Sequence, residues 1–176
     1  IGLRPVNLHI EGLEKMGVKF LVEDGYVKGK VKGKLKGARI KLNNVSVGAT
    51  ENLMMAACLA NGETIIENAA REPEVKDLAR FLIKMGAQIK GHGTKKIVIN
   101  GQKKLNGCKY NIMPDRIEAG TFALGVLGCS GKIVLENVSS EISNHLINIF
   151  SPIQELKIKK CLDNSCINIS RSIKKI

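Results

Sequence analysis

The sequence repeats itself with a period of about 70 residues. Residues 13–20 (LEKMGVKF) return as 82–89 (LIKMGAQI), and 61–68 (NGETIIEN) return as 130–137 (SGKIVLEN), each 69 positions further along the chain. A third match, residues 35–37 with 105–107, has a spacing of 70. Such a period indicates successive copies of one supersecondary unit, because each copy buries its apolar surface against its neighbours.

The copy between residues 48 and 116 shows the unit most clearly. Its residues predict an apolar helix at 49–60, a strand at 64–67, an amphipathic helix at 73–85, and strands at 87–90, 96–99 and 108–113. Pro73 suits the first position of the second helix, and Gly86 suits the position just after its end. The apolar residues of that helix recur at helical spacing, so it has one apolar side.

The other two copies are incomplete. The first, about residues 1–47, begins at its amphipathic helix, 5–16. It continues into a hairpin formed by 19–23 and the residues from Tyr26 onward. The third, about residues 117–176, has an apolar helix at 120–129 and a second helix at 141–150, after which Pro152 interrupts the pattern. This last copy departs most from the repeat.

Two of the predicted helices, 49–60 and 120–129, are apolar on all sides. A helix with no polar side must be surrounded by other elements, so we expect both at the centre, with sheets and amphipathic helices around them. The sequence therefore predicts an α/β fold whose repeats are arranged about a pseudo-threefold axis.

Composition excludes some classes of protein. With 176 residues, of which 44% are apolar, the chain can bury a sizeable core. The formal charge of +12 favours acidic partners, whereas the aromatic content of 3% argues against a stacking platform for single-stranded nucleic acid. No apolar run is long enough for a membrane span and no signal peptide is evident, so we expect a cytoplasmic protein that binds neither membrane nor nucleic acid. Because the first residue is Ile1, we expect the chain to begin inside a longer protein.

The cysteines are odd in number, and two lie in apolar helical segments, so we expect no disulfide framework. Cys161 and Cys166 lie in a predicted hairpin, where the absence of nearby His or Cys residues makes a metal site unfavourable. The five residues are Cys58, Cys108, Cys129, Cys161 and Cys166.

Five lysines alternate with other residues between Lys28 and Lys36. In a strand this spacing places all five ammonium groups on one face. A solvated sheet edge protected from aggregation explains the pattern better than a binding surface does.

Two stretches resemble anion sites. At residues 45–50 (VSVGAT) a β-branched run leads into the apolar helix, so unpaired N–H groups gather there. The simpler interpretation, that Ser46 or Thr50 caps a buried helix, stays open. Arg4 precedes the first helix, and a guanidinium and a helix start together suit a phosphate. Taken alone, Arg4 is better explained as a solvated arginine, and His9 as a histidine at the surface or behind the residues that touch a ligand.

Five motifs in order resemble one family. Residues 1–9 (IGLRPVNLH), 25–27 (GYV), 45–50 (VSVGAT), 67–74 (ENAAREPE) and 114–118 (PDRIE) closely resemble the UDP-N-acetylglucosamine 1-carboxyvinyltransferases, a family of enolpyruvyl transferases. The resemblance runs from Ile1 to about Asn137. It implies βαβαββ units packed as an inside-out α/β barrel in two lobes, of which this chain is mostly one. The first and third motifs favour this family over the related shikimate-pathway enzymes.

The resemblance also implies a reaction of peptidoglycan synthesis. The 3′-hydroxyl of UDP-N-acetylglucosamine attacks C2 of phosphoenolpyruvate, a tetrahedral intermediate forms, and phosphate leaves. No metal or organic cofactor is needed, and the second lobe of the same protein completes the site. The family's catalytic cysteine is expected just before Ile1, so no catalytic residue is expected in this chain, and the fragment alone is expected to bind weakly without turnover. The alternative is a non-catalytic remnant whose basic surface binds polyanions.

Matching motifs also give the substrate-binding residues that the resemblance implies. They are Arg4, Pro5, Val6, Asn7 and Leu8 on the uridine and diphosphate side, and Asn44, Val45, Ser46, Val47 and Gly48 around the diphosphate. Asn7 stands where many members have Asp, and Asn44 where many have Lys. Four further residues match positions near the cleft, although helix caps and salt bridges explain them equally well: Arg71, Glu72, Asp115 and Arg116.

Overall fold

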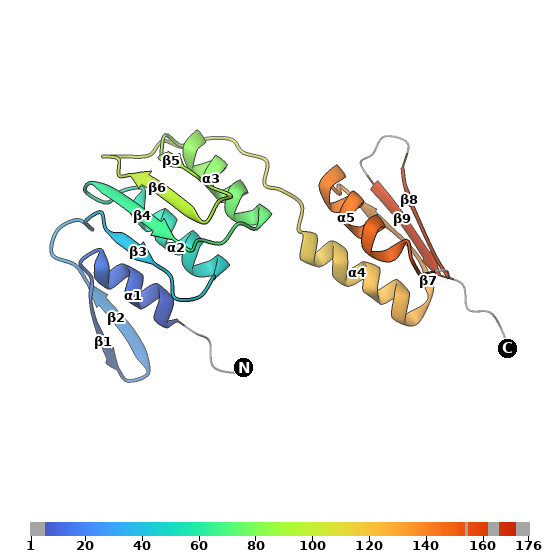
Figure 1. Cartoon of the computed structure of the whole chain (residues 1–176), viewed down its shortest axis with the longest axis horizontal. Helices are drawn as coiled ribbons and strands as arrows, with labels where there is room; N and C mark the ends of the chain where they lie inside the picture. Colours follow the sequence, from blue (N-terminus) through green and yellow to red (C-terminus); the bar gives the residue numbers. More distant parts are fainter. Residues whose placement is uncertain (1–5, 154, 162–165, 172–176) are drawn as a thin grey trace. The chain divides into compact units, whose positions relative to one another are not determined.

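The computed structural model describes residues 6–153, 155–161 and 166–171. The chain divides into two compact units, Ile1–Asn111 and Ile112–Ile176, and each is described here by itself (Figure 1). Within the described residues, no helix is both long enough and apolar enough to cross a membrane.

The first unit combines helices with a four-stranded and a two-stranded sheet. Its elements are α1 (Asn7–Lys15), β1 (Lys19–Glu23), β2 (Tyr26–Lys30), β3 (Arg39–Lys41), α2 (Val47–Ala57), β4 (Glu63–Glu67), α3 (Pro73–Lys84), β5 (Gln88–Lys90) and β6 (Lys96–Asn100). The larger sheet has the order β3-β4-β6-β5, in which β3 and β4 are parallel and the other pairs antiparallel. β1 and β2 form a separate antiparallel hairpin.

The core of the first unit confirms the prediction for its apolar helix. Leu53, Met54 and Ala57 of α2 are fully buried, and they belong to the same cluster as Ile66 of β4 and Ile97 of β6. The helices α1 and α3 each contact α2. These contacts cover most of the apolar helix, as expected for a helix without a polar side, although Met55 is 46% exposed.

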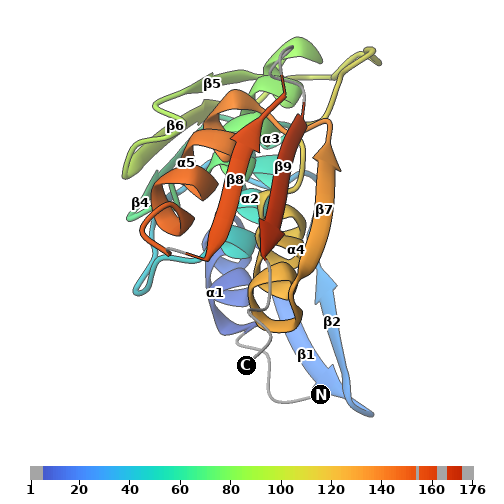
Figure 2. The same cartoon turned by 90° about the vertical axis from the view of Figure 1, so that its right-hand side faces the viewer.

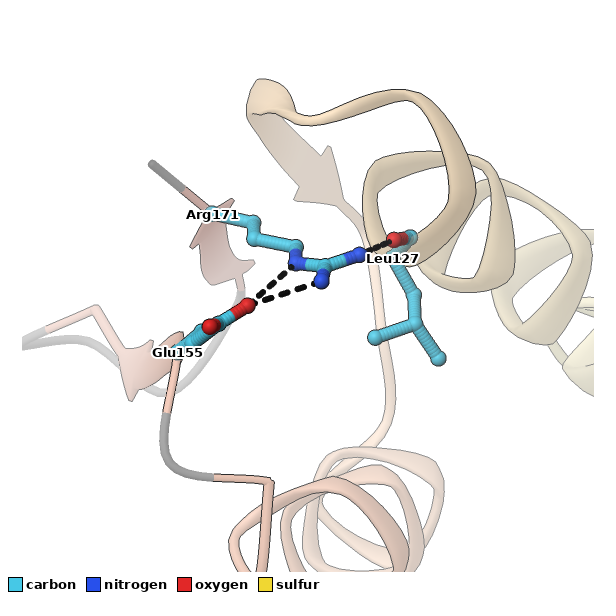
Figure 3. Close-up of polar contacts among 3 residues, drawn as sticks. All are labelled: Leu127, Glu155 and Arg171. Carbon is cyan, nitrogen blue, oxygen red and sulfur yellow. Dashed lines mark hydrogen bonds and ion pairs between the residues drawn. The ribbon is translucent and has the colours of Figure 1, made fainter. Parts of the chain in front are cut away.

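The second unit packs two helices on a three-stranded antiparallel sheet, as Figure 2 shows. Its elements are α4 (Arg116–Cys129), β7 (Gly131–Glu136), α5 (Ser140–Phe150), β8 (Leu156–Lys160) and β9 (Cys166–Arg171), in the sheet order β7-β9-β8. Arg171 at the end of β9 forms an ion pair with Glu155 at 2.8 Å and donates a hydrogen bond to the Leu127 carbonyl of α4 (Figure 3). These contacts connect the sheet to α4 and to the turn before β8.

The second apolar helix differs from the expectation that it is surrounded. Ala123 of α4 is fully buried, whereas Phe122 is 51% exposed and Leu124 is 57% exposed. Among the described residues of the second unit, α4 contacts β7, β9 and α5. Its own unit therefore leaves part of the apolar surface of this helix exposed.

The strand predicted at 108–113 is wrong, because these residues form no strand. The segment is attached to α3 through side chains instead. Tyr110 donates a hydrogen bond from its hydroxyl to Asp77 Oδ1 at 2.8 Å and packs on the Phe81 ring, and Lys84 donates to the Lys109 carbonyl at 2.6 Å. These bonds fix the segment without a ladder of backbone bonds.

Two smaller expectations also change. The lysine-rich stretch leaves the strand after Lys30, and the chain turns at Gly33, which adopts a positive φ of 77°. All five lysines are exposed, in agreement with a solvated surface. Cys161, just after β8, forms a disulfide with Cys166 at the start of β9, a bond that the expectation of no disulfide framework did not include, while Cys58, Cys108 and Cys129 are free.

Candidate functional site

The start of α2 is capped by Ser46. Its Oγ accepts a hydrogen bond from the Ala49 N–H at 3.2 Å, and its carbonyl accepts bonds from the Thr50 N–H and hydroxyl. The capping role is therefore confirmed for Ser46. No acidic residue lies in the first turn of α2. The positive end of the helix dipole thus has no carboxylate of its own, which leaves it able to attract an anion.

The start of α1 has the same property. Val6 occupies the N-cap position without a side-chain cap, and the first turn contains no acidic residue. Asn7 is exposed, whereas Leu8 points into the core with 7% of its surface exposed. Arg4 and Pro5 lie outside the described residues.

These two helix starts lie side by side. His9, in the first turn of α1, has Nδ1 3.0 Å from the Asn52 Nδ2 of α2. A Cβ built on Gly48, in the first turn of α2, would lie 3.8 Å from His9 Nε2. Asn43, just before α2, donates to Glu11 of α1 at 3.5 Å. The structure therefore places the first turn of α1, which follows the predicted residues 6–8, beside Gly48 at the start of α2.

A basic hollow adjoins the start of α2. It is lined by Val45 and Ala69, by the supporting candidates Arg71 and Glu72, and by Lys76, Gly93 and Lys95. The Glu72 carboxylate accepts a hydrogen bond from the Arg71 N–H at 2.7 Å. With three cationic side chains and one carboxylate, the lining favours an anionic ligand.

The other supporting candidates belong to the second unit. Asp115 is the N-cap of α4, where its Oδ1 accepts bonds from the Ile117 N–H at 2.7 Å and the Glu118 N–H at 3.1 Å. Arg116 begins that helix. Capping thus accounts for Asp115 within its own unit.

Sequence patterns did not identify every residue near these helix starts. Lys76 comes from α3 and Lys95 from the turn before β6, so only the folded chain brings them beside Val45. Asn52 lies within the predicted apolar helix 49–60, and no spacing in the sequence relates it to His9. Among the described residues, no group of three or more His, Cys, Asp or Glu side chains is placed to hold a metal ion.

Comparison with known proteins identifies the relatives of this chain. The family model for EPSP synthase (3-phosphoshikimate 1-carboxyvinyltransferase) matches residues 1–170. UDP-N-acetylglucosamine 1-carboxyvinyltransferase of Shewanella woodyi is 64% identical over 133 residues, and that of Pseudoalteromonas atlantica is 60% identical over 141 residues. These matches cover 76% and 80% of this chain but only 32% and 34% of the relatives. The chain thus spans about a third of their length.

Solved structures give the same fold. The enolpyruvyl transferase NikO from Streptomyces tendae superposes with a TM-score of 0.73 at 19% identity, covering 95% of this chain and 42% of that chain. EPSP synthase from Acinetobacter baumannii superposes with a TM-score of 0.64 at 25% identity, covering 96% of this chain and 39% of that chain. The enolpyruvyl transferase fold predicted from the motifs is confirmed.

Proposed function

This chain belongs to the EPSP synthase (3-phosphoshikimate 1-carboxyvinyltransferase) family, and from this premise we propose that it is part of a UDP-N-acetylglucosamine 1-carboxyvinyltransferase. The observation that carries the proposal is the 64% identity over 133 residues to a relative of that name. The whole protein would transfer the enolpyruvyl group of phosphoenolpyruvate to UDP-N-acetylglucosamine in the cytoplasm, where both substrates occur.

The proposed reaction is an addition followed by an elimination. The 3′-hydroxyl oxygen of the sugar forms a bond to C2 of phosphoenolpyruvate, a base takes the hydroxyl proton, and the methylene carbon gains a proton. The C2–O bond to phosphate then breaks, the new methyl group loses a proton, and the double bond reforms as inorganic phosphate leaves. These steps require an acid, a base and cations around the phosphates, and no metal or organic cofactor.

This chain would bind and orient the sugar nucleotide. Ser46, Val47 and Gly48 provide the start of α2, where helix N–H groups favour a diphosphate. The adjacent start of α1, with Val6, Asn7 and Leu8, and the preceding Arg4 and Pro5 would contact the uridine and the diphosphate from the other side. The lack of acidic residues in both first turns and the basic hollow beside Val45 support this role.

The remaining residues of the site have secondary roles in the proposal. Asn44 and Val45 would form the loop that reaches the diphosphate. Arg71 and Glu72, which line the basic hollow, would contribute charge near the cleft. For Asp115 and Arg116, which belong to the second unit, a role in substrate binding stays a prediction from the motif resemblance. The acid, the base and the second lobe would come from other parts of the whole protein.

A substitution at Gly48 tests the proposal without weakening the fold. Gly48 is exposed, and a Cβ there would meet only the His9 ring, at 3.7 Å and 3.8 Å, which is ordinary van der Waals contact. Aspartate in the first turn stabilises a helix through its dipole, but its charge would repel a diphosphate. Gly48→Asn has nearly the same shape without the charge and is the matched control.

We expect calorimetric titration of this chain to show saturable binding of UDP-N-acetylglucosamine. Binding should be lost in Gly48→Asp and largely retained in Gly48→Asn, with the helix content of both variants unchanged. 3-Phosphoshikimate should give no saturable binding. Absence of sugar-nucleotide binding by the unmodified chain, or equal affinity in Gly48→Asp, would contradict the proposal, as would binding only to a short RNA in a salt-sensitive manner.

A further inference from the structure

The His9 side chain lies between the first turn of α1 and the side of α2. It is half-buried, and its Nδ1 is 3.0 Å from the Asn52 Nδ2. With the Asn52 amide as the donor, Nδ1 uses its lone pair as the acceptor. In a neutral imidazole only one nitrogen carries a proton, so this contact leaves the proton on Nε2. Asn52 therefore fixes both the orientation of the ring and its tautomer.

The opposite edge of the ring faces the start of α2. A Cβ built on Gly48 would lie 3.7 Å from His9 Cε1 and 3.8 Å from His9 Nε2. Gly48 is the second residue of α2, whose first turn has no acidic residue. The N–H of Nε2 is thus a further donor next to backbone donors that already favour an anion.

We infer that His9 is a diphosphate-binding residue of the proposed sugar-nucleotide site, with Asn52 as the residue that positions its ring. The Nε2 proton donates to a phosphate oxygen bound at the start of α2. This inference rests on the function proposed above and adds to it two residues that the motif comparison did not assign. It applies to ligands that carry the diphosphate and not to the uridine alone.

Asn52 has a position that suits this role. It lies on α2, a helix whose other residues are mostly apolar, half of them buried, and it is partly buried itself. A polar side chain on such a helix loses hydration, which a hydrogen bond offsets. Its amide nitrogen makes this contact with the ring of His9. The pair thus satisfies Asn52 while it directs Nε2 towards the start of α2.

Two replacements of His9 test the role of Nε2 apart from that of Nδ1. The amide of glutamine reaches about as far as Nε2 and retains a donor there, whereas the shorter asparagine places its amide near Nδ1 and provides nothing at Nε2. In this chain we expect His9→Asn to weaken UDP binding about tenfold and His9→Gln to weaken it no more than about twofold, in line with the value of a hydrogen bond to a charged group. Uridine should bind all three proteins equally.

The positioning role of Asn52 has its own readout. Long-range ¹H–¹⁵N spectra report which ring nitrogen carries the proton, and comparison with His9→Gln assigns the His9 signals among the three histidines. We expect the Nε2–H tautomer in the unmodified chain, a shift of the Nε2 signal when UDP is added, and a mixture of tautomers in Asn52→Leu. A purely structural pair would show no shift of Nε2 with UDP.

The outcomes distinguish this inference from the proposed function. If the unmodified chain binds UDP and His9→Asn binds it as tightly, the inference about His9 is wrong and the proposed function stands. If His9→Asn loses uridine as well as UDP, His9 acts through the structure and the inference is equally wrong. If the unmodified chain does not bind UDP-N-acetylglucosamine, the proposed function itself fails.

Discussion

Thr50 Oγ1 accepts a hydrogen bond from the Ala70 N–H at 3.0 Å, and both residues are fully buried. The same hydroxyl donates to the Ser46 carbonyl at 2.7 Å. The first turn of α2 is thereby connected to the loop that carries Arg71 and Glu72. This bond helps to place the basic hollow next to the start of α2, so it links the stability of the core to the geometry of the proposed site.

Replacing Thr50 with valine should therefore destabilise the first unit. Valine has nearly the same shape but leaves the Ala70 N–H buried without its acceptor, which costs about 1–3 kcal/mol. Thr64 provides a matched control, since it is fully buried and its hydroxyl has no partner among the described residues. Urea denaturation followed by circular dichroism should show a loss for Thr50→Val and no loss for Thr64→Val. Equal losses would show that the Ala70 bond contributes little.

The close packing of α1 on α2 gives a second prediction. A Cβ built on Gly12 would lie 2.5 Å from a methyl carbon of Leu53, which is fully buried. Alanine normally favours a helix by about 1 kcal/mol over glycine, but here overpacking of about 1–3 kcal/mol opposes it. Gly12→Ala should lower the unfolding free energy in urea denaturation. Shortening the neighbour in Gly12→Ala/Leu53→Val should recover part of the loss, and simple additivity of the two changes would contradict this account.

The sequence predicted these features to different degrees. The repeat and its apolar helix were predictable because burial follows from composition and period, as Leu53 and Met54 confirm. The strand at 108–113 was not, because its β-branched and aromatic residues satisfy strand propensity while Tyr110 bonds to Asp77 of α3. Propensity describes a local preference, and a side-chain contact across 33 positions overrides it.

The candidate site shows the same division. Ser46 and Gly48 were predictable because a cap and a helix start are local patterns, and the adjacent α1 followed from the motifs. Lys76, Lys95 and Asn52 were not, since each reaches its neighbours only through packing of separate elements. A single sequence contains no spacing rule for such contacts.

The buried thiol of Cys58 gives a prediction about reactivity and pH. Burial raises the pKa of Cys58 to about 11, and its Sγ donates to the Met54 carbonyl at 3.2 Å. Between these two pKa values the thiol stays protonated in the folded state but loses its proton in the unfolded state. The contribution of this thiol to the free energy of unfolding is therefore full below the ordinary pKa of 9.0 and is lost as the pH rises towards 11. Iodoacetamide at pH 8 should modify the exposed Cys129 first and Cys58 only after urea is added, as read by mass spectrometry. Rapid modification of Cys58 in the folded chain would be inconsistent with its burial.

The departure at Asn44 gives a prediction about affinity. Asn44 is exposed in the loop just before Ser46, where many members of the resembled family have lysine. A lysine there would add one charge contact to the diphosphate, worth about 1 kcal/mol once solvent screening is considered, or roughly fivefold in affinity. We expect Asn44→Lys to tighten binding of UDP-N-acetylglucosamine in calorimetric titration and to do so less at high salt.

The neighbouring Asn43 separates a specific contact from a general effect of charge. It is also exposed, but its amide donates to Glu11 of α1 at 3.5 Å, so a lysine there would pair with that carboxylate. Asn43→Lys should therefore change the affinity for UDP-N-acetylglucosamine little, although it raises the net charge by the same amount. If both variants tighten binding equally, the sugar nucleotide responds to the overall positive potential of this chain, and the loop before α2 does not contact the diphosphate through residue 44.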